Sequence, residues 1–185
     1  MRAKRIFIFI FLLIITTTVY SQDYNQKSSL RVFFKIEIFA DKIALGYEIP
    51  LDNKFLVDFS AGIGAANDFR NGNRGIKWAE NNTSYLGPLL RGQMRYYFNR
   101  DNREKRDHSL TNNAGSFLGL QSKFNFNGNK DIGQVLLSEL HFGQQLPIGK
   151  SLFLRYHAGI GYGYNFGVKY SSIYPAIGLV LGYGF

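Results

Sequence analysis

Apolar and polar side chains alternate along eight segments of the chain, at the two-residue period of a β-strand. In the second segment, Ile43, Leu45 and Tyr47 fall on one face, while Ala44 and Glu48 fall on the other. Large apolar residues thus occupy one face of each segment, and small, polar or charged residues occupy the opposite face. The alternation predicts eight strands, at residues 30–39, 43–51, 55–64, 86–98, 118–126, 136–146, 152–164 and 173–185.

The connections between these strands divide into short turns and longer polar loops. Asp52-Asn53 is the signal of a two-residue hairpin, and Gly149-Lys150 indicates another hairpin turn. Elsewhere the alternation stops in stretches rich in Asn, Gly and charge, which we expect to be loops. These loops are residues 66–83, 99–113, 127–131 and 166–172.

Alternation alone does not separate a membrane barrel from a soluble β-sandwich, since both pair an apolar face with a polar one. Three features favour the barrel. The predicted strands run to about ten residues, the length of a tilted membrane strand. Their polar faces are crowded with glycine, and aromatic residues gather at strand ends, as Tyr96 with Phe98 and Tyr162 with Tyr164 do. We therefore predict an all-β fold, an eight-stranded antiparallel up-and-down transmembrane β-barrel.

The last predicted strand, read as IYPAIGLVLGYGF, has large apolar residues on one face and an almost bare opposite face. With its terminal aromatic residue, it resembles the final strand of bacterial outer-membrane β-barrels. With eight predicted strands, the chain resembles the small OmpA/OmpX-like barrels of the Gram-negative cell envelope. This resemblance implies that Tyr183 and Phe185 form the signal read by the barrel-insertion machinery.

The N-terminal segment has the features of a secretory signal peptide. Arg2, Lys4 and Arg5 precede an apolar run, and Val19 and Ser21 fit a cleavage site before Gln22. The apolar run is too short for a membrane-spanning helix of roughly 20 residues. We predict a signal peptide at residues 1–21, a barrel domain at 22–185 and a location in the outer membrane.

Composition changes this picture little. Aromatic residues make up 16% of the chain and it has 20 glycines, both of which a barrel explains. It has no cysteine, which excludes disulfides and thiolate metal sites. The formal charge of +9 does not predict nucleic-acid binding, because the predicted compartment holds none.

The polar faces of the predicted strands carry twelve ionisable residues that would face the lumen. Charges enclosed in a barrel must be paired or hydrated, so we expect a network of salt bridges that fills the interior. Such a barrel would be rigid and nonconductive. The twelve residues are Arg31, Lys35, Glu37, Glu48, Asp58, Arg91, Arg95, Lys123, Glu139, His141, Arg155 and His157.

Two of the polar loops are candidate contact sites. Residues 66–83 would face outward and contain Arg70, Arg74, Lys77 and Trp78, a composition common at binding hot spots. A loop that touches solvent or lipopolysaccharide without a dedicated partner is the simpler interpretation. Residues 99–113 would lie on the periplasmic side, where both signs of charge predict a disordered, self-compensated turn, with contact to the cell wall or a periplasmic partner as the alternative.

Enzymatic and metal chemistry have weaker signals. Ser60, His157 and either Asp58 or Glu139 could form a hydrolytic set, as in small outer-membrane lipid-modifying enzymes, but no serine has a G-x-S-x-G context. Metal binding through His141, His157 and Glu139 is equally unspecific. We therefore predict no catalytic residues, no metal and no cofactor.

The predicted function is a structural or surface-interaction role in the outer membrane, with a side-chain-filled lumen. The expected partners are outer-membrane lipid, lipopolysaccharide and the insertion machinery, with the protein itself a monomer. The alternatives are a narrow, porin-like channel for small solutes and a lipid-modifying enzyme.

Overall fold

The computed structural model describes residues 29–39, 41–70, 73–77, 79–80, 83–84, 86–126 and 133–185. The predicted signal peptide, the predicted loop at 127–131 and Trp78 lie outside these residues. Within the described part of the chain, no helix has both the length and the apolar character needed to cross a membrane.

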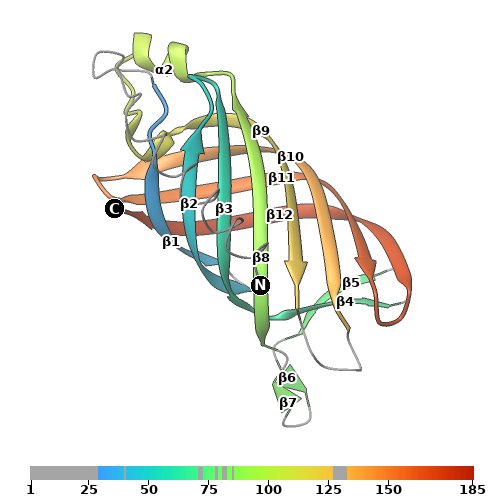
Figure 1. Ribbon diagram of the computed structural model, residues 1–185. Helices are drawn as coiled ribbons and strands as arrows, with labels where there is room; N and C mark the ends of the chain where they lie inside the picture. Colours follow the sequence, from blue (N-terminus) through green and yellow to red (C-terminus); the bar gives the residue numbers. More distant parts are fainter. Residues whose placement is uncertain are drawn as a thin grey trace, which may run out of the picture.

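Eight antiparallel strands close into a barrel (Figure 1), as the alternation predicted. Each strand pairs with the next barrel strand in the chain, and the first pairs with the last to complete the circle. The barrel strands are β1 (Phe33–Phe39), β2 (Lys42–Pro50), β3 (Phe55–Gly64), β8 (Gly87–Tyr97), β9 (Gly115–Asn125), β10 (Val135–Ile148), β11 (Leu152–Asn165) and β12 (Tyr170–Gly184).

The predicted assignment of faces agrees with the observed burial. The large apolar residues of the barrel strands are exposed on its outside, and the charged residues between them are buried inside. On β2, for example, Leu45 is 66% exposed, whereas Glu48 is fully buried. The interior of the barrel is therefore polar, with smaller apolar clusters near its two ends.

Inward-facing rings explain many of the glycines. Phe153 lies against Gly182, the residue paired with it on β12, and Tyr174 lies against its own pairing partner, Gly161. A Cβ atom at either glycine would collide with the ring. Glycine is therefore needed where a neighbouring ring lies across the strand, as well as where the lumen is narrow.

Residues 66–83, predicted to be a loop, instead contain short hairpins. β4 (Ala66–Arg70) pairs with β5 (Asn73–Lys77), and β6 (Ala79–Glu80) pairs with β7 (Thr83–Ser84). The β4–β5 hairpin leaves the barrel between β3 and β8 and approaches β11 and β12. It was missed because its polar sequence lacks the apolar alternation that marked the barrel strands.

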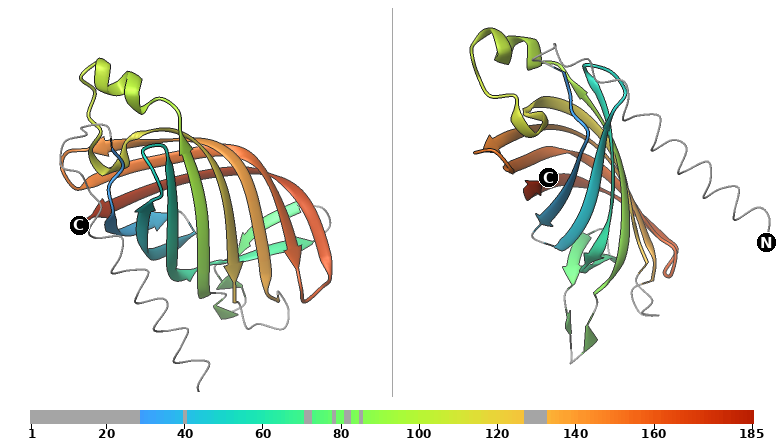
Figure 2. Two further views of the ribbon diagram at one scale, coloured as in Figure 1. Left: turned by 45° about the horizontal axis from the view of Figure 1, so that its top comes forward. Right: turned by 60° about the vertical axis from the view of Figure 1, so that its left-hand side comes forward.

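The opposite end of the barrel carries helix α2 (Arg100–Lys105) and the 3-10 turn η1 (Thr111–Asn113) (Figure 2). The prediction that residues 99–113 are disordered was therefore wrong. The buried guanidinium of Arg100 holds this segment in place by donating to the carbonyl oxygens of Ala114, at 2.8 Å, and Ser29, at 2.9 Å. Burial lowers the pKa of Arg100 from its ordinary value, because desolvation disfavours the charged form.

Both predicted hairpin turns are one residue longer than a two-residue loop. Leu51 pairs with Phe55 through a hydrogen bond from its N–H to the Phe55 carbonyl oxygen, at 2.9 Å. The Asp52 carboxylate then accepts the N–H groups of Lys54, at 2.6 Å, and Phe55, at 2.7 Å. At the other turn, the register pairs Ile148 with Leu152.

Candidate functional site

The interior of the barrel holds two adjoining polar clusters. The first, here called the arginine layer, combines four cationic side chains with three carboxylates, all at most 3% exposed. Its members come from β1, β2, β3, β8 and β11, because each strand turns its small and polar face inward. They are Lys35, Glu37, Glu48, Asp58, Arg91, Arg95 and Arg155.

Lys35 lies at the centre of the arginine layer. Its Nζ atom is 2.7 Å from Glu37 Oε1, 2.6 Å from Glu48 Oε1 and 2.7 Å from Asp58 Oδ2. One ammonium group therefore bridges all three carboxylates. Close pairing of this kind is required in a dry interior, because each isolated charge would cost several kcal/mol to desolvate.

Three arginines complete the layer from the surrounding wall. Arg91 Nη2 lies 2.6 Å from Glu37 Oε2 and 3.0 Å from Asp58 Oδ2. Arg155 Nη2 reaches Glu37 Oε1 at 2.5 Å, and Arg95 pairs with both Glu48 and Asp58. The layer therefore ties strands on opposite sides of the barrel together.

Neutral side chains that were not among the predicted network residues extend the layer. Gln145 Oε1 accepts hydrogen bonds from Arg95, at 2.9 Å, and from Arg155, at 3.2 Å. Asn113 Nδ2, from η1, donates to Glu48 Oε2 at 2.8 Å. The alternation had placed Gln145 on the inward face, but no local signal indicates that Asn113 reaches inside from a loop.

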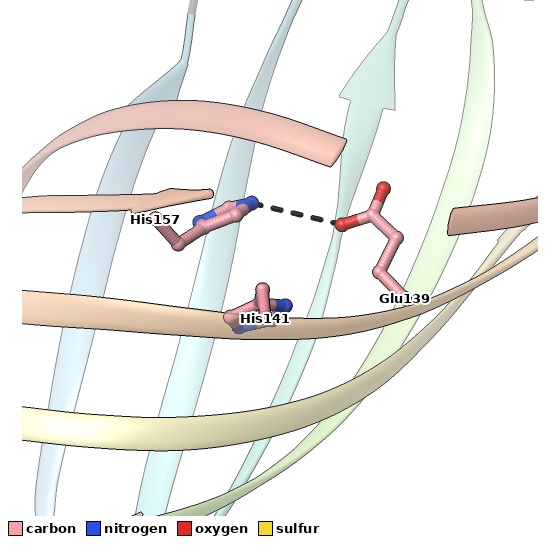
Figure 3. Close-up of side chains that lie close together, drawn as sticks. All are labelled: Glu139, His141 and His157. Atoms are coloured by element: carbon pink, nitrogen blue, oxygen red, sulfur yellow. Dashed lines mark ion pairs between the residues drawn. The ribbon is translucent and has the colours of Figure 1, made fainter. Parts of the chain in front are cut away.

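The second cluster, here called the histidine layer, lies closer to the β4–β5 end. Glu139 and His141 come from β10 and His157 comes from β11. Figure 3 shows the two imidazole rings one above the other, with the carboxylate to one side. The ring centroids are 4.2 Å apart, and His157 Nε2 lies 3.6 Å from Glu139 Oε2.

Neighbouring side chains hold Glu139 and His141. The hydroxyl of Tyr174 donates to Glu139 Oε1 at 2.8 Å, and Lys123 Nζ donates to the same oxygen at 3.0 Å. Gln121 donates to the other carboxylate oxygen. The amide nitrogen of Gln93 lies 2.9 Å from His141 Nε2.

Most of the predicted lumen residues are inside the barrel, with two departures. Arg31 is exposed and precedes β1, so its side chain does not belong to the network. Its backbone N–H donates to the Asn113 side-chain oxygen at 2.8 Å. The prediction for Arg31 was wrong because the strand was expected to begin at residue 30, whereas β1 begins at Phe33. Lys123 lies at the rim of the histidine layer, where its side chain is 12% exposed.

The proposed hydrolytic set is not assembled by any hydrogen bond. Ser60 Oγ is buried and has no hydrogen-bond partner among the described residues. Asp58 is held by the cations of the arginine layer, and Glu139 faces His157 without Ser60 between them. Nothing in this arrangement would activate the hydroxyl as a nucleophile.

The remaining predicted residues lie outside the lumen clusters. Arg70 lies on β4, while Arg74 and Lys77 lie on β5, whose backbones pair. Tyr183 and Phe185 are exposed on the outside of the barrel, 44% and 71% respectively, and their rings contact each other edge to face.

Two groups of side chains among the described residues have donor atoms close enough to share a metal ion. One comprises Glu37, Glu48 and Asp58, where the Lys35 ammonium already occupies the centre. The other comprises Glu139, His141 and His157. The sequence alone gave this second group no specific metal-binding signal, whereas the fold brings its three donor atoms within 4.8 Å of one another.

Comparison of the chain with known protein families, with curated proteins and with solved structures finds no match.

Proposed function

We propose that this chain is an exported outer-membrane β-barrel of the small OmpA/OmpX-like class, with a structural or surface-interaction role. The observation that carries the proposal is the apolar outside of a closed barrel whose charges are inside. Ile173, Ile177 and Ile160 are 71%, 76% and 68% exposed, and among the described residues they belong to a set of thirty exposed large aliphatic and aromatic side chains. A soluble monomer rarely exposes apolar surface of this extent, whereas hydrocarbon accommodates it.

Barrel closure supports the same proposal. In hydrocarbon every backbone N–H and C=O group requires a partner, and only a closed sheet leaves no strand edge. Outward aromatic pairs near the strand ends, such as Phe55 with Tyr96 and Tyr183 with Phe185, suit the interfacial girdles of a membrane barrel.

The filled interior favours a structural role over a channel. Ion-paired side chains of the arginine layer cross the lumen, and η1 lies against them through Asn113. Small solutes would have to displace buried ion pairs to pass.

We also propose that the loops and hairpins at the β4–β5 end, including Arg70, Arg74 and Lys77, face outside the cell and contact lipopolysaccharide.

A heat-modifiability gel tests the location and architecture together. Outer membranes are extracted with mild detergent, and unboiled and boiled samples are compared for mobility in SDS. We expect the unboiled protein to migrate as a compact species, because a membrane barrel resists SDS until heated. Recovery of the protein in the soluble periplasmic fraction, with equal mobility in both lanes, would contradict the proposal.

Planar-bilayer recording separates the structural role from the channel. We expect no unitary conductance from the refolded protein. Steps of conductance that change in Arg91→Ala or Arg95→Ala would instead assign the barrel to transport.

Insertion through the terminal strand is tested separately. It predicts that the double variant Tyr183→Ala, Phe185→Ala lowers the amount of heat-modifiable protein in outer membranes.

A further inference from the structure

We propose that Glu139, His141 and His157 bind one divalent transition-metal ion inside the barrel. One donor atom from each residue lies within 4.8 Å of the others. Zinc bonds nitrogen and oxygen at about 2.0–2.2 Å, so ligands of a tetrahedral ion lie roughly 3.4 Å apart. The three side chains would have to close by about 1 Å or slightly more, which side-chain torsions provide without moving the strands.

The hydrogen bonding of the two imidazoles is independent evidence for a missing partner. His141 and His157 are 1% and 6% exposed, and the Nδ1 atom of each is buried without a hydrogen-bond partner among the described residues. His157 Nε2 is also poorly satisfied, since 3.6 Å to Glu139 is too long for a normal hydrogen bond. In a neutral imidazole one nitrogen carries hydrogen and the other carries a lone pair. When the Gln93 amide is turned so that its Oε1 atom, which is buried and unpaired, accepts from His141 Nε2–H, the lone pair of this ring lies on Nδ1, and a metal ion is a partner for it.

The three residues, drawn in Figure 3, are oriented by contacts with neighbouring side chains and strands. Tyr174 and Gln121 hold the Glu139 carboxylate, and Gln93 holds the His141 ring. Each imidazole also lies against the glycine paired with it on the adjacent strand, His141 against Gly119 and His157 against Gly178. Outer contacts of this kind fix the orientation of metal ligands and raise their affinity.

Lys123 is the main competitor of the ion. Its ammonium lies 3.0 Å from Glu139 Oε1 and now balances the carboxylate charge. Because its side chain lies at the rim and is 12% exposed, it can move outward when a divalent ion takes over that charge. Removing this lysine should therefore strengthen metal binding.

The donor types indicate which ions would bind. Two imidazoles and one carboxylate suit zinc, copper, nickel and cobalt, whereas magnesium and calcium prefer sites made only of oxygen. The site requires only the closed barrel, so it does not depend on the proposed membrane location.

Titration with Co²⁺ tests the site. The full mature protein is refolded in detergent, treated with a chelator and checked for folding by its heat-dependent gel mobility. We expect the absorption bands of a tetrahedral cobalt complex to saturate at one equivalent and to disappear when Zn²⁺ is added. A folded wild-type protein without these bands would overturn the proposal, and it would leave the proposed function untouched.

Three histidine variants identify the ligands. His141→Gln and His157→Gln should each weaken Co²⁺ binding at least tenfold. His108→Gln should bind like the wild type, because His108, the one other histidine in the sequence, lies exposed on the segment between α2 and η1. Loss of binding in His108→Gln alone would place the ion at the surface and overturn the assignment.

Lys123→Met provides a test that does not remove a ligand. Loss of the competing ammonium should raise the affinity for Co²⁺ several-fold if Glu139 is a ligand. Weaker binding in this variant would contradict the role of Glu139, even if the histidine variants failed to fold.

Discussion

The two clusters both lie inside the barrel but satisfy their buried polar groups in different ways. In the arginine layer, four cations surround three carboxylates, and Lys35 alone contacts Glu37, Glu48 and Asp58. In the histidine layer, a single carboxylate is surrounded mostly by neutral groups. Burial is nearly complete in both, so the difference lies in how charge is compensated.

Both clusters keep some polar atoms without a hydrogen bond, but the chemistry of those atoms differs. The unpaired nitrogens of the arginine layer are Nε atoms of Arg91 and Arg95, which carry hydrogen and have no lone pair to offer. Its unpaired oxygen, Asp58 Oδ1, belongs to a carboxylate whose charge Lys35 and the arginines already balance. The unpaired nitrogens of His141 and His157 belong to imidazoles, which bind metals. Equal burial can therefore produce a closed electrostatic structure in one cluster and a ligand set in the other.

Removing one carboxylate from the arginine layer should have the largest effect. Glu37 contacts Lys35, Arg91 and Arg155, so Glu37→Ala would leave buried cations uncompensated. We expect a loss of about 3–5 kcal/mol in the free energy of unfolding, measured by urea titration of the refolded protein in lipid vesicles.

An exposed ion pair supplies the control. Lys54 and Asp101 lie 3.6 Å apart with side chains 48% and 62% exposed, so Asp101→Asn should change the stability little. If both variants had equally small effects, the arginine layer would not be the stabilising element described here.

Zinc should stabilise the histidine layer specifically. At a free Zn²⁺ concentration one hundred times the dissociation constant, the wild type should gain about 2.7 kcal/mol of unfolding free energy. The gain should vanish in His141→Gln and persist in His108→Gln. A gain of the same size in both variants would mean that zinc stabilises the barrel elsewhere.

A substitution at Gly178 tests how tightly the His157 ring is packed without changing any charge. Gly178→Ala puts a methyl group against the His157 ring, which must then move, at a cost of about 1–3 kcal/mol. Gly92→Ala is the matched control, since the nearest atom to a Cβ there is Phe59 Cε1, at 3.8 Å. Urea titration of the two variants should give clearly different midpoints, and equal midpoints would contradict the tight fit at Gly178.

The smallest effect is expected at Arg31. Its side chain is exposed and outside the arginine layer, so Arg31→Ala should alter the unfolding free energy by no more than about 0.5 kcal/mol. Arg155→Met is the buried comparison and should cost several times more, because Glu37 and Gln145 lose a donor. A large loss of unfolding free energy in Arg31→Ala would mean that the Arg31 side chain belongs to the lumen network, as the sequence predicted.

Strand positions and faces were predictable because burial imposes a period of two on every barrel strand. The β4–β5 hairpin was not, since backbone pairing of polar residues leaves no periodic signal. Asn113 was missed because it reaches Glu48 from a loop, a contact that depends on the path of the whole segment. The sequence named His141, His157 and Glu139 together, but the contact between the two rings depends on the register of β10 and β11, in which Ile148 pairs with Leu152 across a three-residue turn.

The closing seam has a consequence for the kinetics of assembly. β1 meets β12 only from Lys35–Gly184 to Phe39–Val180, and it is the one ladder of the barrel that joins strands at opposite ends of the chain. All the other ladders of the barrel join consecutive barrel strands, so they form from smaller loops and at lower entropic cost. Glu37 on β1 pairs with Arg155 on β11, and these strands lie on opposite sides of that seam. Lys35 and Arg91 reach Glu37 without this seam, whereas Arg155 reaches it only across the seam. The last strand pairing and the Glu37–Arg155 ion pair therefore form in one step, which predicts slower closure in Glu37→Gln when refolding is followed by gel mobility.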